Sequence, residues 1–178
     1  MYEESKLDEA RYFYSRIVSE TDNRQNLIFD LSAFLSAARS VLQYAFEEAR
    51  NKPSGQQWYD NQMASSAVLT FFKDKRDINV HIQPIQVGQH TSIQLTDVVH
   101  ISESIHIKKF DQNGKLIGEY SSEPSQPSPM SDIPPIVSHR FTFPDWYGNE
   151  EVLELCNLYL EQLERVVADG QSKGFLTK

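Results

Sequence analysis

The stretch Lys73-Asp74-Lys75-Arg76-Asp77-Ile78-Asn79-Val80-His81 separates two parts of the chain that have different residue patterns. Before it, apolar residues recur every three or four positions, as on the buried face of a helix. After it come Pro84 and Gly88, and then apolar residues that alternate with polar ones, which is typical of strands. We therefore expect helices up to His81 and strands beyond it.

Three helical segments are expected up to the end of this stretch. The first runs from about Glu4 to Ser19, and the second from about Leu27 to Asn51. Lys52-Pro53-Ser54-Gly55 ends the second, because a proline disfavours helix in the residue before it. A third pattern begins near Trp58 and leads into residues 73–81.

A fourth helix is expected near the C-terminus. Pro144-Asp145-Trp146-Tyr147-Gly148-Asn149 ends the extended part, and the most complete apolar stripe of the chain follows, from Val152 to Val167. Gly170 is the expected end of this helix, and the tail from Gln171 to Lys178 is expected to fray.

The region between the third and fourth helices is expected to be rich in β-structure. Val98 to Tyr120 should form a hairpin, because alternating residues flank Asn113-Gly114, a pair favoured in tight turns. Ile136 to Phe143 alternates too and is a candidate third strand of that hairpin. Ile82 to Thr96 is expected to be irregular or weakly extended. Glu123 to Pro135 contains five prolines and predicts an exposed loop, or alternatively a recognition tether.

These elements predict a mainly α fold. We expect an antiparallel four-helix bundle that carries a β-hairpin or three-stranded insertion between its third and fourth helices. A length of 178 residues suits one domain with a substantial core. Residues 1–178 are therefore expected to form a single domain, with the β-rich insertion at about 82–143.

The composition narrows the classes of function. A net charge of -8 disfavours non-specific binding to nucleic acid, unless basic residues cluster locally. Cys156 is the single cysteine, so no internal disulfide can form. The polar N-terminus and the lack of any apolar run of about eighteen residues predict a cytoplasmic protein that does not enter a membrane.

Arg76-Asp77-Ile78-Asn79-Val80-His81, at the end of a helix within such a bundle, resembles the signature of the HEPN superfamily, an Arg followed by a His after four to six residues. The second helix, around Leu31 to Leu42, also resembles that of HEPN proteins. The resemblance covers about Leu7 to His81 and Asn149 to Ala168. It implies either a dimeric, metal-independent endoribonuclease of the toxin–antitoxin or phage-defence kind, or a non-catalytic binding or dimerisation module.

For the enzyme, the resemblance implies Arg76 and His81 as catalytic residues. A histidine moves protons near neutral pH and a guanidinium binds phosphate, so RNA cleavage needs neither a metal nor another cofactor. Asp77 and Asn79 would be supporting polar residues, and Lys73 and Lys75 would bind RNA. Asp77 either orients His81 or, by placing negative charge beside the phosphate, marks a chain that has lost the activity.

Helix geometry limits how this motif can work. Five residues of an ideal helix turn by about 500°, which leaves Arg76 and His81 roughly 140° apart. The segment must therefore bend, unwind, or combine two copies in a homodimer. A plainer alternative is a helix end that passes into a short strand, with Arg76 paired to Asp74 or Asp77.

The remaining candidate sites favour structural roles. His100 and His106 share a strand face, but no cysteine or carboxylate joins them at the spacing of metal ligands, so no metal site is expected. The aromatic pairs Trp58-Tyr59 and Trp146-Tyr147 either stack bases or, more simply, fasten helix ends to the core. The expected partners are a second copy of the chain, RNA for the enzyme, and an antitoxin-like protein or other regulator for the binding module.

Overall fold

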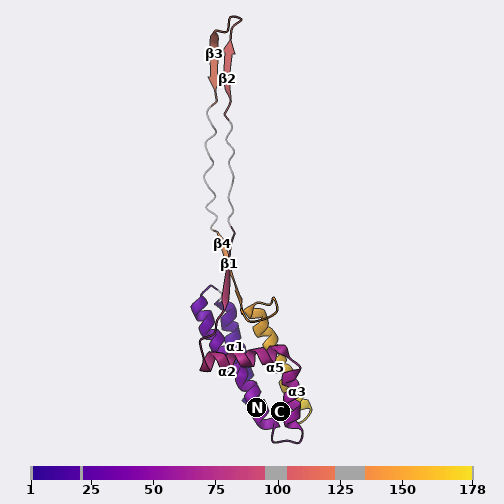
Figure 1. Ribbon diagram of the computed structural model, residues 1–178. Coiled ribbons are helices and arrows are strands. Elements are labelled where there is room, and N and C mark those ends of the chain that lie inside the picture. Colours follow the sequence, from indigo (N-terminus) through magenta and orange to yellow (C-terminus); the bar gives the residue numbers. More distant parts are fainter. Residues whose placement is uncertain (1, 21, 95–103, 123–134, 178) are drawn as a thin grey trace. The chain divides into compact units, whose positions relative to one another are not determined.

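The computed structural model describes residues 2–20, 22–94, 104–122 and 135–177. These residues form five helices and four strands, shown in Figure 1. The chain divides into two compact units, Met1–Thr91 with Ser138–Lys178 and, separately, Ser92–Val137. The first unit contains all five helices.

Three helices correspond to predicted ones: α1 (Tyr2–Ser19), α2 (Arg24–Ala49) and α5 (Val152–Ser172). The side chain of Asn23 caps α2 by accepting the backbone N–H groups of Gln25 and Asn26. At α5, Glu151 and Glu154 form a reciprocal capping box. The start of both helices is therefore fixed by local side chains.

The prediction of a four-helix bundle is wrong, because the expected third helix is two helices. These are α3 (Gly55–Ala64) and α4 (Ala67–His81). The break falls at Ser65 and Ser66, where the Ser66 hydroxyl accepts the backbone N–H of Leu69 at 3.2 Å and starts a new helix. The predicted mainly α character is confirmed, with five helices in place of four.

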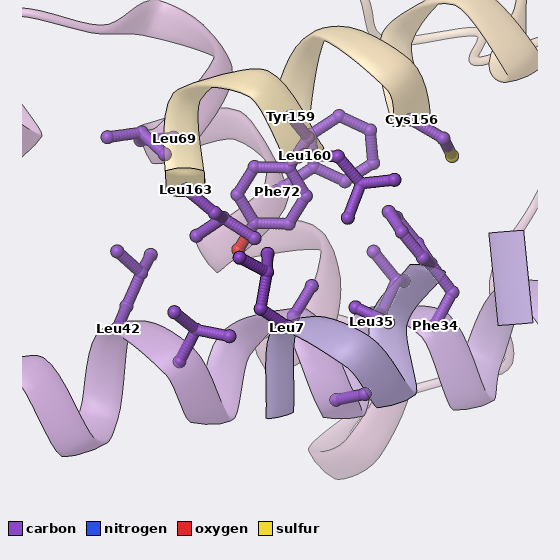
Figure 2. Close-up of a cluster of buried hydrophobic side chains, with 14 of the residues drawn as sticks. Leu7, Phe34, Leu35, Leu42, Leu69, Phe72, Cys156, Tyr159, Leu160 and Leu163 are labelled. Carbon is purple, nitrogen blue, oxygen red and sulfur yellow. The ribbon is translucent and has the colours of Figure 1, made fainter. Parts of the chain in front are cut away.

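The core lies where α1, α2, α4 and α5 meet. Figure 2 shows Leu7 of α1 and Phe34, Leu35 and Leu42 of α2 facing side chains of α4 and α5. The Phe72 and Tyr159 rings stack with centroids 4.5 Å apart and planes 3° from parallel. Such stacking adds to the burial of apolar area, which is the main stabilising term in a core of this kind.

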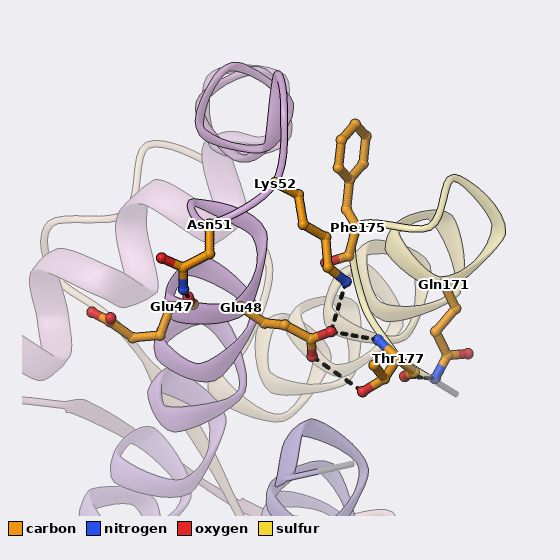
Figure 3. Close-up of polar contacts among 7 residues, drawn as sticks. All are labelled: Glu47, Glu48, Asn51, Lys52, Gln171, Phe175 and Thr177. Atoms are coloured by element: carbon orange, nitrogen blue, oxygen red, sulfur yellow. Dashed lines mark hydrogen bonds and ion pairs between the residues drawn. The ribbon is translucent and has the colours of Figure 1, made fainter.

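The C-terminal tail packs against the helices, so the prediction that it frays is wrong. Gly174 takes a left-handed conformation (φ 76°), which turns the chain back after α5. Leu176 is then buried, and Phe175 stacks on Trp58 at 5.2 Å between centroids. Figure 3 shows Glu48 accepting hydrogen bonds from Lys52 and from Thr177, and the bond from Thr177 holds this tail to α2.

The strands form two separate two-stranded sheets. In one, β1 (Gly88–Gln94) pairs with β4 (Ile136–Thr142). In the other, β2 (His106–Phe110) pairs antiparallel with β3 (Leu116–Ser121). A three-stranded insertion in which Ile136 to Phe143 joins the hairpin is therefore wrong. Part of the segment Ile82 to Thr96, which was expected to be irregular or weakly extended, is the strand β1.

The predicted hairpin is confirmed for its described part. Asp111 Oδ1 accepts the backbone N–H groups of Asn113 at 2.9 Å and Lys115 at 2.8 Å, and Gly114 has a φ of 78° that suits a glycine. Residues 98–103 of the predicted hairpin, and residues 123–134 of the proline-rich segment, lie outside the described residues.

Candidate functional site

Arg76 and His81 lie on one uninterrupted helix. Helix α4 continues to His81, and the N–H of Ile82 closes its last turn on the carbonyl of Ile78 at 2.9 Å. The segment stays helical to His81, so in ideal helix geometry the two side chains leave the helix in directions about 140° apart. Within one chain they do not converge, and only a second copy could bring an Arg76 to a His81.

Each of the two residues has a different environment. His81 is exposed, and among the described residues it has no hydrogen-bond or ion-pair partner. Arg76 pairs with the neighbouring Asp77, Nη1 to Oδ1 at 3.1 Å. Its Nε is buried without a hydrogen-bond partner within the described part of the chain. The guanidinium is therefore already engaged by a carboxylate on one side.

Asn79 joins three segments of the chain. Its Nδ2 donates to Ser32 Oγ of α2 at 2.7 Å, and its Oδ1 accepts the backbone N–H of Ile85 at 3.0 Å. Both ends of the amide are thus used to hold the end of α4 against α2 and to position the chain that follows. This arrangement gives Asn79 a structural role.

The two lysines do not form a common patch. Lys75 is buried, with its ammonium paired to Asp145 and lying over the Phe71 and Phe143 rings, 5.4 and 5.2 Å from their centroids. A lysine held in this way has few donors left for a phosphate. Lys73 is partly exposed, 3.9 Å from Asp74, and lines a pocket.

This pocket is an open cavity of about 440 Å³ between α2, α3 and α4. The residues that line it are Arg39, Gln43, Phe46, Tyr59, Asp60, Met63, Ala64, Thr70 and Lys73. Two of them are cationic and one is anionic. The Asp60 carboxylate already has a hydrogen-bond partner on α3, because the Gln56 amide donates to its two oxygens at 2.9 and 3.0 Å.

Arg39 is one of the two cationic residues that line the pocket. Its Nη1 is buried without a hydrogen-bond partner, and in the described ranges no carboxylate lies within 4.0 Å of its guanidinium. Burial raises the pKa of Tyr59, and the positive charge of Arg39, together with a hydrogen bond between the two side chains, partly offsets this rise. Burial likewise raises the pKa of Tyr159, where Arg39 acts in the same opposing direction. Both tyrosines are therefore neutral neighbours of a charged guanidinium.

Arg39 was not among the residues that the sequence pattern singled out. A signal was present, because Arg39 is the only charged residue between Leu31 and Phe46, a stretch whose apolar residues form the buried face of α2. A charged residue in such a position is expected to have a partner in the fold or in a bound ligand.

A second candidate surface is the β2–β3 hairpin. Cross-strand pairing of Ile107 with Tyr120, and the hydrogen bond from Ser122 N to Ile105 O, put Ile105, Ile107 and Tyr120 on one face. All three are more than half exposed. The opposite face holds a polar cluster in which Glu119 pairs with His106 at 2.6 Å and with Lys108 at 3.7 Å. The hairpin is therefore amphipathic.

Comparison of the chain with protein-family models, with curated proteins and with solved structures gave no match. Within the described ranges, no helix has the length and apolar character needed to cross a bilayer. The same residues contain no group of three or more histidine, cysteine, aspartate or glutamate side chains arranged to hold a metal ion.

Proposed function

We propose that this chain is a non-catalytic binding module that captures another protein through the apolar face of its β2–β3 hairpin. The observation behind this proposal is the exposure of Ile105, Ile107 and Tyr120 on one face of a two-stranded ribbon. A two-stranded hairpin is marginally stable in water unless its apolar face is covered. A docked partner would supply that cover.

The charge of the hairpin indicates what kind of partner it fits. Residues 104–122 contain three lysines and two carboxylates, a net charge of +1, whereas the whole chain has a net charge of -8. Phe110, Leu116 and Ile117 are further exposed apolar residues near the turn, and the adjacent pair Leu116 and Ile117 lies on opposite faces. The complementary partner has an apolar groove with carboxylates at its rim, since opposite charges at the rim favour correct encounter.

A metal-independent endoribonuclease is the second candidate, favoured by the exposed and unpartnered ring of His81. It requires a homodimer in which His81 of one copy meets Arg76 of the other. Three contacts count against it, because each engages a residue that the enzyme would need. Asp77 pairs with Arg76, Asp145 pairs with Lys75, and Ser32 accepts the hydrogen bond of Asn79. We therefore place this activity second.

Capture from an extract of the native cells tests the first candidate. The baits are the wild-type chain, a variant with Ile107→Asp and Tyr120→Asp on the apolar face, and a control with Gln112→Asp and Ser121→Asp. Both variants add two negative charges to the hairpin, but the control leaves the apolar face intact. A captured protein is then purified and titrated against all three baits by calorimetry.

We expect the wild type and the control to bind the captured protein, and the apolar-face variant to lose it. Equal binding by all three would refute the hairpin as the docking surface. Light scattering on the same samples shows whether the occupant is instead a second copy of the chain.

The enzyme is tested separately with labelled RNA in excess EDTA. As a binding module, the pure wild-type chain should cleave no more RNA than its His81→Ala variant. Cleavage that is present in the wild type and lost in His81→Ala would establish the ribonuclease instead.

A further inference from the structure

We propose that the pocket between α2, α3 and α4 binds a small organic anion with an aromatic or alkyl body, and that Arg39 holds its anionic group. This site is independent of the hairpin and of the Arg76 to His81 segment. Nothing in the proposed function of the hairpin requires it.

The anionic end is inferred from the state of Arg39. A guanidinium has five N–H donors, and a buried donor left without an acceptor is costly, so native structures provide partners for such groups. Arg39 Nη1 is buried and has no partner among the described residues. Its neutral neighbour Tyr59 does not balance its charge. A carboxylate or phosphate in the pocket would provide the missing charge beside the Arg39 side chain that lines it.

Lys73 strengthens the preference for an anion. It belongs to the α4 part of the lining, and its ammonium is only loosely associated with Asp74 at 3.9 Å. Within the described part of the chain, Asp60 is the only carboxylate of the lining, and Gln56 already donates to both of its oxygens. The local balance therefore favours negative charge in a chain that is acidic as a whole.

The body of the ligand is inferred from the other walls. Phe46 and Tyr59 have ring centroids 5.0 Å apart and, together with Met63, present apolar surface to the cavity. A volume of about 440 Å³ exceeds that of a bare inorganic ion. Pockets of this size with few polar groups are typical of small-molecule sites, in which apolar walls supply affinity and the polar groups fix orientation.

The test uses 1-naphthyl phosphate as a probe, titrated into the full chain by calorimetry. Inorganic phosphate and 1-naphthol represent its two halves. The variants are Arg39→Gln and Lys73→Met, with Arg165→Gln as the matched control, since Arg165 is an exposed α5 arginine whose nearest carboxylate is Glu161 at 4.0 Å. Thermal unfolding of each variant establishes that it is folded.

We expect 1-naphthyl phosphate to bind more tightly than either half, and its dissociation constant to rise about tenfold or more in Arg39→Gln, because a hydrogen bond to a charged group is lost. Lys73→Met should raise it by a smaller factor, and Arg165→Gln should leave it unchanged. Equal binding by Arg39→Gln and the wild type would overturn the proposal. Absence of binding by the wild type, or affinity for 1-naphthol equal to that for the phosphate, would overturn it too.

Discussion

Asn79 Nδ2 donates to Ser32 Oγ at 2.7 Å, which ties the last turn of α4 to the first half of α2. The same amide accepts the backbone N–H of Ile85, so one side chain serves two bonds. Replacement Asn79→Ala should lower the free energy of unfolding by about 1–3 kcal/mol, because it leaves the Ile85 N–H without its acceptor. Urea denaturation measures this change.

Asn157→Ala is the control for that prediction. Asn157 also donates its amide to another side chain, Glu161 at 2.9 Å, but it does so on an exposed face of α5. We expect a loss within about 0.5 kcal/mol there. Equal losses for the two alanine variants would mean that Asn79 does not join α4 to the rest of the fold.

Lys75 and Asp145 form an ion pair in which the two side chains differ in exposure. This difference predicts which of two substitutions, one at each residue, lowers the free energy of unfolding more. Lys75 is buried, whereas the Asp145 side chain is 54% exposed. Asp145→Asn should therefore cost more, about 1–3 kcal/mol, because it leaves a buried ammonium without its carboxylate. Lys75→Met should cost less, because its stem keeps its contacts with Phe71 and Phe143 and the freed carboxylate is solvated. Thermal and urea unfolding measure both losses. A larger loss for Lys75→Met than for Asp145→Asn would contradict this prediction.

The periodicity of apolar residues predicted much of the helical structure. It did not predict which strands, far apart in the chain, pair with each other. The apolar stripes of α1, α2 and α5 are periodic over many residues, and each of these helices appears where expected. The partner of β4 could not be predicted in this way, because β1 is more than forty residues earlier in the chain and has few apolar residues. The break between α3 and α4 depends on the cap formed by the Ser66 hydroxyl. In the sequence this single serine is a weaker signal than the helical spacing of apolar residues on both sides of it.

The same holds for the candidate site: contacts between neighbours in the sequence could be predicted, and contacts between distant residues could not. The sequence places Arg76 next to Asp77, and the structure pairs them. It does not show that Asp145 would hold Lys75, or that Ser32 would hold Asn79, because these partners are 70 and 47 positions away in the chain. Such contacts decide whether a polar side chain is available for function, and they depend on the packing of the helices.

Tyr159→Phe should be neutral or stabilising, although Tyr159 lies in the centre of the core. Its hydroxyl is buried and has no hydrogen-bond partner among the described residues. The phenylalanine variant no longer has to remove this polar group from water on folding. The stacking on Phe72 is retained. We expect the free energy of unfolding to rise by up to about 1 kcal/mol. Tyr159→Leu is the comparison, and it should lower that free energy by about 2–4 kcal/mol because the ring is lost. A clear loss of stability in Tyr159→Phe would mean that the hydroxyl has a partner.

Glu48 should make the stability of the C-terminal tail depend on pH. Burial by itself would raise the pKa of Glu48, but hydrogen bonds from Lys52 and from the backbone and hydroxyl of Thr177 outweigh it and lower the pKa (Figure 3). A carboxyl whose pKa is lower in the folded chain stabilises it above the unfolded pKa, about 4.3 for a glutamate. This stabilisation is lost as the pH falls through the folded value.

The variant Glu48→Gln isolates this contribution. At pH 7 it should unfold more easily than the wild type by about 1 kcal/mol, because the charge-assisted hydrogen bonds are weakened. Between about pH 5 and pH 3 the difference should shrink towards zero, since the wild-type carboxyl becomes protonated. Glu161→Gln is the control: this partly exposed glutamate of α5 has an ion pair with Arg165 at 4.0 Å and a local hydrogen bond from Asn157, and the change should make little difference at either pH. A gap between Glu48→Gln and the wild type that stays constant from pH 7 to pH 3 would contradict the lowered pKa, because a neutral hydrogen-bonding role for Glu48 has no such pH dependence.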